Sequence, residues 1–165
     1  MLKRMFPVFL VIFALSIGAA AQKASGVVKC AKPEKPSAIQ VAHHADHSLG
    51  VSQTNCVWTQ PMTIAGVKTK EGVDTSTSDT KGGAAHIHGY YVDTMENGDT
   101  ASYKYEGTAT MKNGAVVTGE DKWELMEGTG KLKGMKGSGT CKGKGGADGS
   151  VTWTCDGMFQ PAKSK

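Results

Sequence analysis

The chain lacks the sequence signals of the common nucleotide-binding, metal-binding and nucleophilic catalytic sites. None of its 22 glycines lies in a Gly-x4-Gly-Lys-Ser/Thr or Gly-x-Gly-x-x-Gly motif, so no phosphate-binding loop is indicated. Its four cysteines show no Cys-x-x-Cys spacing, which disfavours zinc and redox sites. No serine or cysteine lies in a nucleophile-elbow pattern, and a strand would place Asp121 on the opposite face from Glu120 and Glu124. The sequence therefore contains no recognisable catalytic constellation.

Helical periodicity and long repeats are also missing after residue 21. Only Gly130 to Lys133 is predicted to form a helical turn. Three hairpin signals occur instead, at Asn97-Gly98, Asn113-Gly114 and Asp148-Gly149, each between runs that alternate apolar and polar residues. Because an open antiparallel sheet leaves two exposed edges, we predict an all-β fold, a closed antiparallel barrel of about eight strands.

The N-terminus predicts export. Lys3 and Arg4 precede an apolar run from Met5 to Ile17, and small residues at 19–21 favour cleavage between Ala21 and Gln22. A retained membrane anchor is the alternative, but the run is short for a span of about 20 residues. We predict a signal peptide at 1–21, an extended arm at 22–37 and a barrel domain at 38–162. The mature protein would be secreted or periplasmic, with no stable membrane span.

Charge gives little indication of a macromolecular partner. Removing Lys3 and Arg4 lowers the formal net charge from +4 to +2. The remaining lysines are dense in Lys131–Lys144, where glycines separate them. Such a stretch can bind nucleic acid or anionic lipid, but in an exported protein we expect a solvated strand face and no nucleic-acid partner.

The even number of cysteines in an oxidising compartment predicts two disulfides. Cys141 and Cys155 lie seven residues on either side of Asp148. A three-residue loop, Ala147-Asp148-Gly149, would place them directly opposite each other on two strands, within disulfide reach. Cys30 then pairs with Cys56.

Alternation defines several strands. We predict short strands at His47–Trp58 and Met62–Val67, separated by Pro61, and a half-buried strand at Tyr103–Met111. The polar segment Glu71–Gly83 fits either an edge strand or a loop.

The run Gly128-Thr129-Gly130-Lys131-Leu132-Lys133-Gly134-Met135-Lys136-Gly137 resembles the stretch before a late strand in allene oxide cyclase-like and dirigent-like barrels. The region from about Val27 to Gln160 is similar to small exported bacterial proteins of this barrel class, which have no assigned activity. The resemblance implies a calycin or lipocalin-like barrel with an apolar lumen. No residue of the plant cyclase's active site matches a position here.

Lumen residues follow from one assumption about a turn. If Asn97-Gly98 is a two-residue turn, facing residues have numbers that sum to 195. The lumen candidates are then His86, His88, Tyr90, Tyr103, Tyr105 and Trp123. Asp121 shares the face of Trp123, whereas Asp93 lies on the other face of the strand from His86 and His88. A register shifted by one residue would instead place both imidazoles in solvent.

The five histidines raise the question of a metal site. His86 and His88 could supply two ligands, with His47 as a third candidate. The cluster of His43, His44, Asp46 and His47 is more simply a solvated loop, and we predict no metal or cofactor.

The leading hypothesis for function is a non-catalytic barrel that binds a small apolar or amphipathic molecule. The alternatives are a lumen isomerase or cyclase and a histidine-based metal-binding protein. The oligomeric state stays open.

Overall fold

The computed structural model describes residues 20–34 and 36–162. Apart from its last two residues, the predicted signal peptide lies outside this range. None of the described helices is long and apolar enough to cross a membrane.

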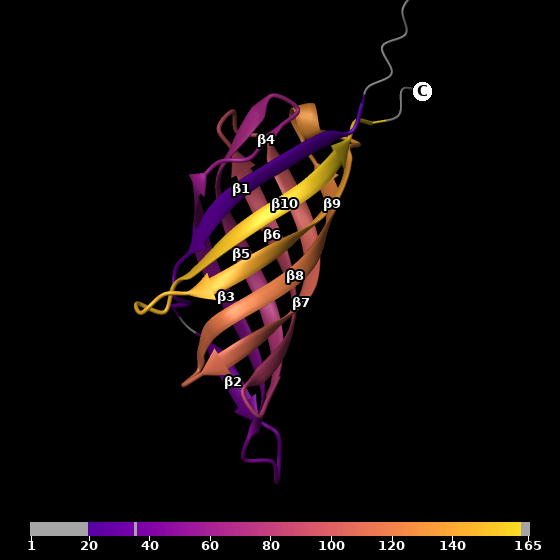
Figure 1. Ribbon diagram of the computed structural model, residues 1–165. Helices are drawn as coiled ribbons and strands as arrows, with labels where there is room; N and C mark the ends of the chain where they lie inside the picture. The colour runs from indigo at the N-terminus through magenta and orange to yellow at the C-terminus, as the bar shows by residue number, and fades with distance from the viewer. Residues whose placement is uncertain (1–19, 35, 163–165) are drawn as a thin grey trace, which may run out of the picture.

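Eight long strands close into a single antiparallel barrel (Figure 1). Around the barrel the order is β1-β10-β9-β8-β7-β6-β5-β3, and β3 returns to pair with β1. The predicted all-β closed barrel is therefore confirmed. Its strands are β1 (Gln22–Cys30), β3 (His47–Gln60), β5 (Val67–Lys81), β6 (Ala84–Met95), β7 (Thr100–Lys112), β8 (Ala115–Gly128), β9 (Lys136–Gly145) and β10 (Val151–Gln160).

Two short strands add to the ends of this barrel. Strand β2 (Ser37–Gln40) pairs with the first part of β3, beyond the end of β1. Strand β4 (Thr63–Ile64) forms a tight hairpin with the start of β5, directly after Pro61. The segment Glu71–Gly83, whose structure the sequence left open, is mostly β5, which pairs with β3 and β6 on its two sides.

The predicted arm at 22–37 is wrong for its first nine residues, because Gln22–Cys30 form barrel strand β1. The inward positions of this strand are small: Ala24, Gly26, Val28 and Cys30. A Cβ on Gly26 would come within 2.9 Å of the side chains of Trp58 and Met62. Glycine at this position therefore leaves room for these two large side chains to pack against the strand. Because its inward residues are small, this strand shows only a weak alternation of apolar and polar residues in the sequence.

Apolar side chains close the end of the barrel at which β4 lies, which is the upper end in Figure 1. A short 3₁₀ helix, η1 (Gly130–Leu132), lies in the connection from β8 to β9, where one helical turn was predicted. Leu132 is fully buried there, as are Ile64 of the β4 hairpin and Phe159 of β10. Met62 and Met95 complete this apolar plug, at 3% and 1% exposure.

The turns decide which side chains face inward. Asn113 and Gly114 both have positive φ, 52° and 77°, as a two-residue type I′ turn requires. At Asn97-Gly98 only Gly98 has positive φ, and the Met95 N–H donates to the Asp99 carbonyl at 2.8 Å. This is a three-residue loop, so the assumed two-residue turn is wrong and facing residues of β6 and β7 sum to 194.

Both predicted disulfides are present. Cys141 faces Cys155 across β9 and β10, around a three-residue loop in which Gly149 has a φ of 80°. Cys30 faces Cys56 across β1 and β3. We call Cys30–Cys56, with a sequence separation of 26, the long-loop disulfide, and Cys141–Cys155, with a separation of 14, the short-loop disulfide.

Candidate functional site

A cavity of about 830 Å³ occupies the middle and lower parts of the barrel. Its wall extends from Trp58 and the plug residue Phe159 at the upper end to Gly83 and Asn113 in the turns at the lower end. Eight-stranded barrels are either filled by their side chains or just wide enough for one small ligand. This barrel is not filled by its side chains, because the cavity remains in its lumen.

The lower lumen is hollow because the inward side chains there are small. Along β3 they are Ser48, Gly50, Ser52 and Thr54, and hydroxyl residues continue this lining on β5. On β6 and β7 the inward positions in this region include Ala85 and Gly107. A full core would need branched or aromatic residues at these places.

Farther up, large aromatic side chains lie along the wall and over glycines of neighbouring strands. Tyr105 of β7 faces Gly89 of β6, and a Cβ at Gly89 would overlap the tyrosine ring. Trp123 of β8 lies in the same way over Gly139 and Gly157. These aromatic residues therefore line the lumen, and the cavity persists beside them.

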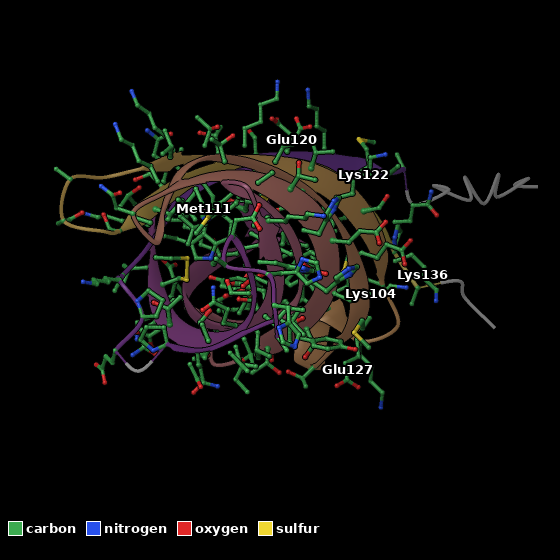
Figure 2. All side chains as sticks on the ribbon, turned by 90° about the horizontal axis from the view of Figure 1, so that it is seen from below. Lys104, Met111, Glu120, Lys122, Glu127 and Lys136 are labelled. Carbon is green, nitrogen blue, oxygen red and sulfur yellow. A yellow bond between two sulfur atoms is a disulfide. The ribbon has the colours of Figure 1, made fainter. Side chains whose placement is uncertain are left out.

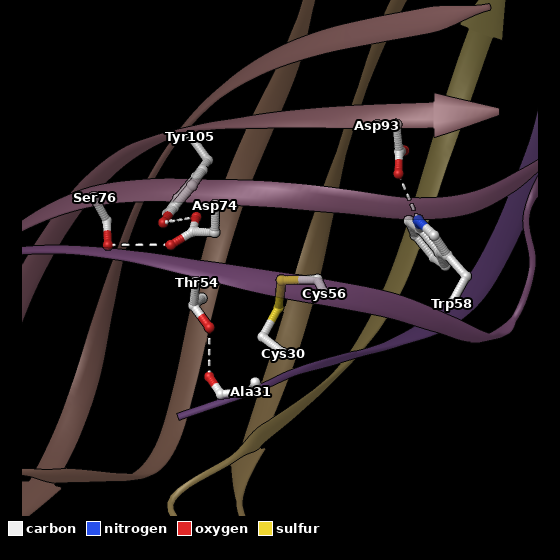
Figure 3. The surroundings of a disulfide bond; sticks show 9 residues. All are labelled: Cys30, Ala31, Thr54, Cys56, Trp58, Asp74, Ser76, Asp93 and Tyr105. Atoms are coloured by element: carbon white, nitrogen blue, oxygen red, sulfur yellow. Dashed lines mark hydrogen bonds between the residues drawn. A yellow bond between two sulfur atoms is a disulfide. The ribbon is translucent and has the colours of Figure 1, made fainter. Parts of the chain in front are cut away.

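Asp74 of β5 receives hydrogen bonds from two neutral hydroxyl groups in the wall (Figure 3). The Tyr105 hydroxyl crosses β6 above Gly89 and donates to Asp74 Oδ1 at 2.6 Å. The Ser76 hydroxyl donates to Oδ2 at 3.2 Å and also contacts the Ser52 hydroxyl at 3.1 Å. Burial raises the pKa of Asp74 despite these bonds, because desolvation penalises the charged form.

Asp93 of β6 is the most deeply buried acid of the site, at 1% exposure. The indole N–H of Trp58 donates to its Oδ1 at 2.6 Å (Figure 3). Desolvation raises the pKa of Asp93 to about 7, although the Trp58 hydrogen bond opposes the shift. The buried hydroxyl of Tyr91, two residues before Asp93 on the same face, has no hydrogen-bond partner. Burial and the nearby Asp93 carboxylate raise the pKa of this tyrosine well above its usual range.

Asp121 of β8 is the third acid in the cavity wall. Desolvation raises its pKa to about 7, and the charge of Asp74 adds to the shift, while the backbone N–H of Cys141 lowers it. Its Oδ1 is buried without a hydrogen-bond partner. The site thus contains carboxyl groups that neutral donors satisfy incompletely.

Three of the six predicted lumen residues line the cavity: Tyr103, Tyr105 and Trp123. Tyr103 packs edge-on against Trp123, with ring centroids 5.4 Å apart, and lies 6.3 Å from the ring of Tyr91. The prediction is wrong for His86, His88 and Tyr90, which lie on the outer face of β6; Tyr90 is 58% exposed. The three-residue loop at 96–98 shifts the register by one residue, which exchanges the two faces of the strand.

The histidines do not come together with other metal ligands. Among the described residues no group of three or more His, Cys, Asp or Glu side chains is placed to hold a metal ion. His47, the third candidate ligand, instead contacts Asp79 Oδ1 through its Nε2, at 2.6 Å.

Asp74, Asp93 and Trp58 were not predicted as site residues. The alternation of Gly72, Asp74 and Ser76 was a usable signal for Asp74, once Glu71–Gly83 is taken as a strand. The sequence predicted Asp93 on the outer face of its strand, away from the two histidines. The corrected register exchanges the two faces and moves Asp93 into the barrel. Only the structure brings Trp58 to Asp93, because β5 lies between their strands.

Comparison with known proteins adds information about the fold. No sequence family and no curated protein matches the chain. A similar solved structure is that of a protein of unknown function from the DUF3224 family of Shewanella oneidensis MR-1. The match covers 87% of this chain and 100% of that one, with a TM-score of 0.52 and 15% sequence identity. At this identity the likeness concerns the barrel fold alone.

Proposed function

We propose that this protein binds one small amphipathic molecule in the lumen of its barrel. The observation that carries the proposal is the cavity of about 830 Å³, which lies in the size range of small-molecule sites. An apolar plug closes its upper end, aromatic rings line its middle, and hydroxyl groups line its lower part. An apolar body would contact the rings, and a polar group would reach the buried carboxyl and hydroxyl groups.

Export is part of the same proposal. Two disulfides favour an oxidising compartment, and the predicted signal peptide agrees with secretion or transfer to the periplasm. The predicted kinship with allene oxide cyclase-like barrels also stays a proposal, supported by the eight-stranded architecture.

The experiment is titration of the purified mature protein with the uncharged fluorescent probe N-phenyl-1-naphthylamine. We expect saturable binding at one site, with quenching of tryptophan fluorescence. Ile87→Trp, on the inner face of β6, should fill the lumen and abolish binding. His86→Trp places the same side chain on the outer face of that strand and should leave binding unchanged. Absence of saturable binding, or equal binding by both variants, would overturn the proposal.

One observation favours a second candidate, acid–base catalysis inside the barrel. A carboxyl group whose pKa is raised to about 7 is suited to proton transfer near neutral pH, and Asp93 lines the cavity next to the unpartnered Tyr91 hydroxyl. This is the predicted isomerase alternative in a specific form, with Asp93 as base and Tyr91 as hydrogen-bond donor. The test uses ligand extracted from protein purified from its own host. Incubation with the protein in deuterated water should introduce deuterium into the ligand, and Asp93→Asn should prevent this; no incorporation would exclude the candidate.

A further inference from the structure

The charges of the lumen are segregated from those of the rest of the protein. Three carboxyl side chains of the cavity wall, from Asp74, Asp93 and Asp121, lie on the inner faces of three different strands, whereas the two other acidic residues of the wall, Asp46 and Glu120, are exposed. Of the described residues that line the cavity, Lys32 is the only basic one, and it lies outside the barrel strands, after β1. The chain as a whole has 19 basic and 15 acidic residues and a formal net charge of +4. The lumen therefore has the opposite charge preference to the chain.

Basic side chains of the barrel strands lie outside. Lys104 of β7 pairs with Glu124 of β8 at 2.9 Å, and both side chains are more than half exposed. In Figure 2 the neighbouring charged side chains of β8, Glu120 and Lys122, also point away from the barrel. No lysine of these strands is thus placed to neutralise the carboxyl groups inside.

The carboxyl groups in the lumen accept hydrogen bonds only from uncharged donors, and not all of their oxygen atoms have a partner. Asp93 accepts from an indole N–H, and Asp74 accepts from two hydroxyl groups. Asp121 Oδ1 is buried and accepts no hydrogen bond, and the buried Tyr91 hydroxyl is also unpartnered. A buried carboxylate is costly without a cationic partner, so these groups would gain most from a ligand that supplies one.

Aromatic rings lie between the acids. Tyr91, Tyr103 and Trp123 form a continuous row across β6, β7 and β8, with successive centroids 6.3 and 5.4 Å apart. Asp93 follows Tyr91 on β6, and Asp121 precedes Trp123 on β8, each two residues away on the same face. Faces of tyrosine and tryptophan rings attract organic cations, and desolvation strengthens the attraction.

Building on the proposed lumen site, we propose that its ligand is an organic cation, an amine or quaternary ammonium group carried on an apolar body. The ammonium group lies among Asp74, Asp93 and Asp121 against the aromatic row. The apolar body contacts the remaining wall. Once they are ionised, these three carboxyl groups repel a carboxylate-bearing ligand such as a fatty acid, which should therefore bind least above a pH of about 7.

The experiment compares decyltrimethylammonium, decanol and decanoate, which share an alkyl chain and differ in charge. Each is titrated by calorimetry into the mature protein at a pH of about 8, below the concentration at which micelles form. We expect the ammonium compound to bind at least about tenfold more tightly than decanol, and decanoate to bind least. Asp121→Asn should lower the ratio of the affinity for the ammonium compound to the affinity for decanol. The matched control is Asp156→Asn, on the outer face of β10, which should change neither.

A second measurement does not depend on any variant. The ionisable residues of the described cavity wall are Asp74, Asp93, Asp121, Tyr91, Tyr103 and Tyr105 inside the barrel, together with Lys32, Asp46 and the exposed Glu120. At a pH of about 7 a bound cation should release protons from the acids, so the calorimetric enthalpy should differ between buffers of different ionisation enthalpy. Equal affinity for all three compounds, or no proton release, would overturn the cation proposal while the lumen site stands. If neither these compounds nor N-phenyl-1-naphthylamine binds, the lumen site itself is refuted.

Discussion

Replacing Asp93 by Asn should make the protein more stable at alkaline pH and should change its stability little at acid pH. In the wild type, Asp93 Oδ1 accepts a hydrogen bond from Trp58 Nε1 at 2.6 Å. The amide retains a carbonyl oxygen that can accept the same bond. It has nearly the volume of the carboxyl group and cannot ionise. The substitution therefore separates the cost of the buried charge from the contribution of the hydrogen bond.

The size of the effect follows from the pKa of Asp93, which burial raises from 3.8 to about 7. Because the folded state holds this proton more tightly than the unfolded state, the stability that Asp93 contributes is complete below a pH of about 4. That stability is lost as the pH rises through about 7. A shift of about three pKa units corresponds to about 4 kcal/mol, at about 1.4 kcal/mol for each unit. The free energy of unfolding of the variant, relative to the wild type, should rise by up to this amount across the interval.

Urea denaturation at pH values of about 4.5 and about 8.5 measures the difference directly. Asp156→Asn, on the exposed face of β10, is the control and should show no comparable change between the two conditions. Equal destabilisation by Asp93→Asn at both pH values would mean that Asp93 is not a neutral, buried acid at low pH, and the reasoning would fail.

Three further predictions concern stability. Replacing both cysteines of the long-loop disulfide by Ser should lower the free energy of unfolding by about 3.5 kcal/mol, because the closed loop has a separation of 26 residues. The same change in the short-loop disulfide, with a separation of 14 residues, should lower it by about 3 kcal/mol. Urea melts that show the reverse order would contradict the loop-entropy argument. His86→Ala with His88→Ala should leave the melting temperature unchanged with or without a chelator, because both side chains are exposed; a chelator-sensitive melt in the wild type alone would contradict this. Gly89→Ala should destabilise by about 1–3 kcal/mol because its methyl group meets the Tyr105 ring, whereas at Gly50 the added methyl meets a serine hydroxyl and should cost less; equal costs in urea melts would oppose the glycine–aromatic packing.

The architecture was predictable from the sequence because its signals are local. An Asn-Gly pair specifies a hairpin through backbone conformation alone, and alternating residues specify a half-buried strand. The pairing of Cys141 with Cys155 followed from their equal distances to Asp148 and a three-residue loop, which the structure contains. In that hairpin the cysteines supplied an independent check on the register.

No such check existed for the hairpin at Asn97-Gly98. It forms the same kind of loop as the hairpin at Asp148-Gly149. Gly98 and Gly149 have φ values of 85° and 80°, and the Asn97 and Asp148 side chains each accept a backbone N–H two residues later. A two-residue and a three-residue loop fit the dipeptide equally well. One residue of difference exchanged the two faces of β6, which moved His86 outward and Asp93 inward.

The hollow interior depends on pairs of residues far apart in the chain, and for this reason the alternation of single strands does not show it. The alternation places Trp123 inside the barrel, but whether its ring projects into the lumen or lies along the wall depends on the strands beside it. Here Gly139 and Gly157 leave room for the ring against the wall, from positions 16 and 34 residues later in the sequence. The same relation holds for Tyr105 and Gly89, and it brings the tyrosine hydroxyl across β6 to Asp74. The glycines beside these rings thus keep the aromatic side chains out of the central space and bring a polar group to its wall. A barrel with the same alternation but alanine at these glycines would have to turn its rings inward, and the cavity would be lost.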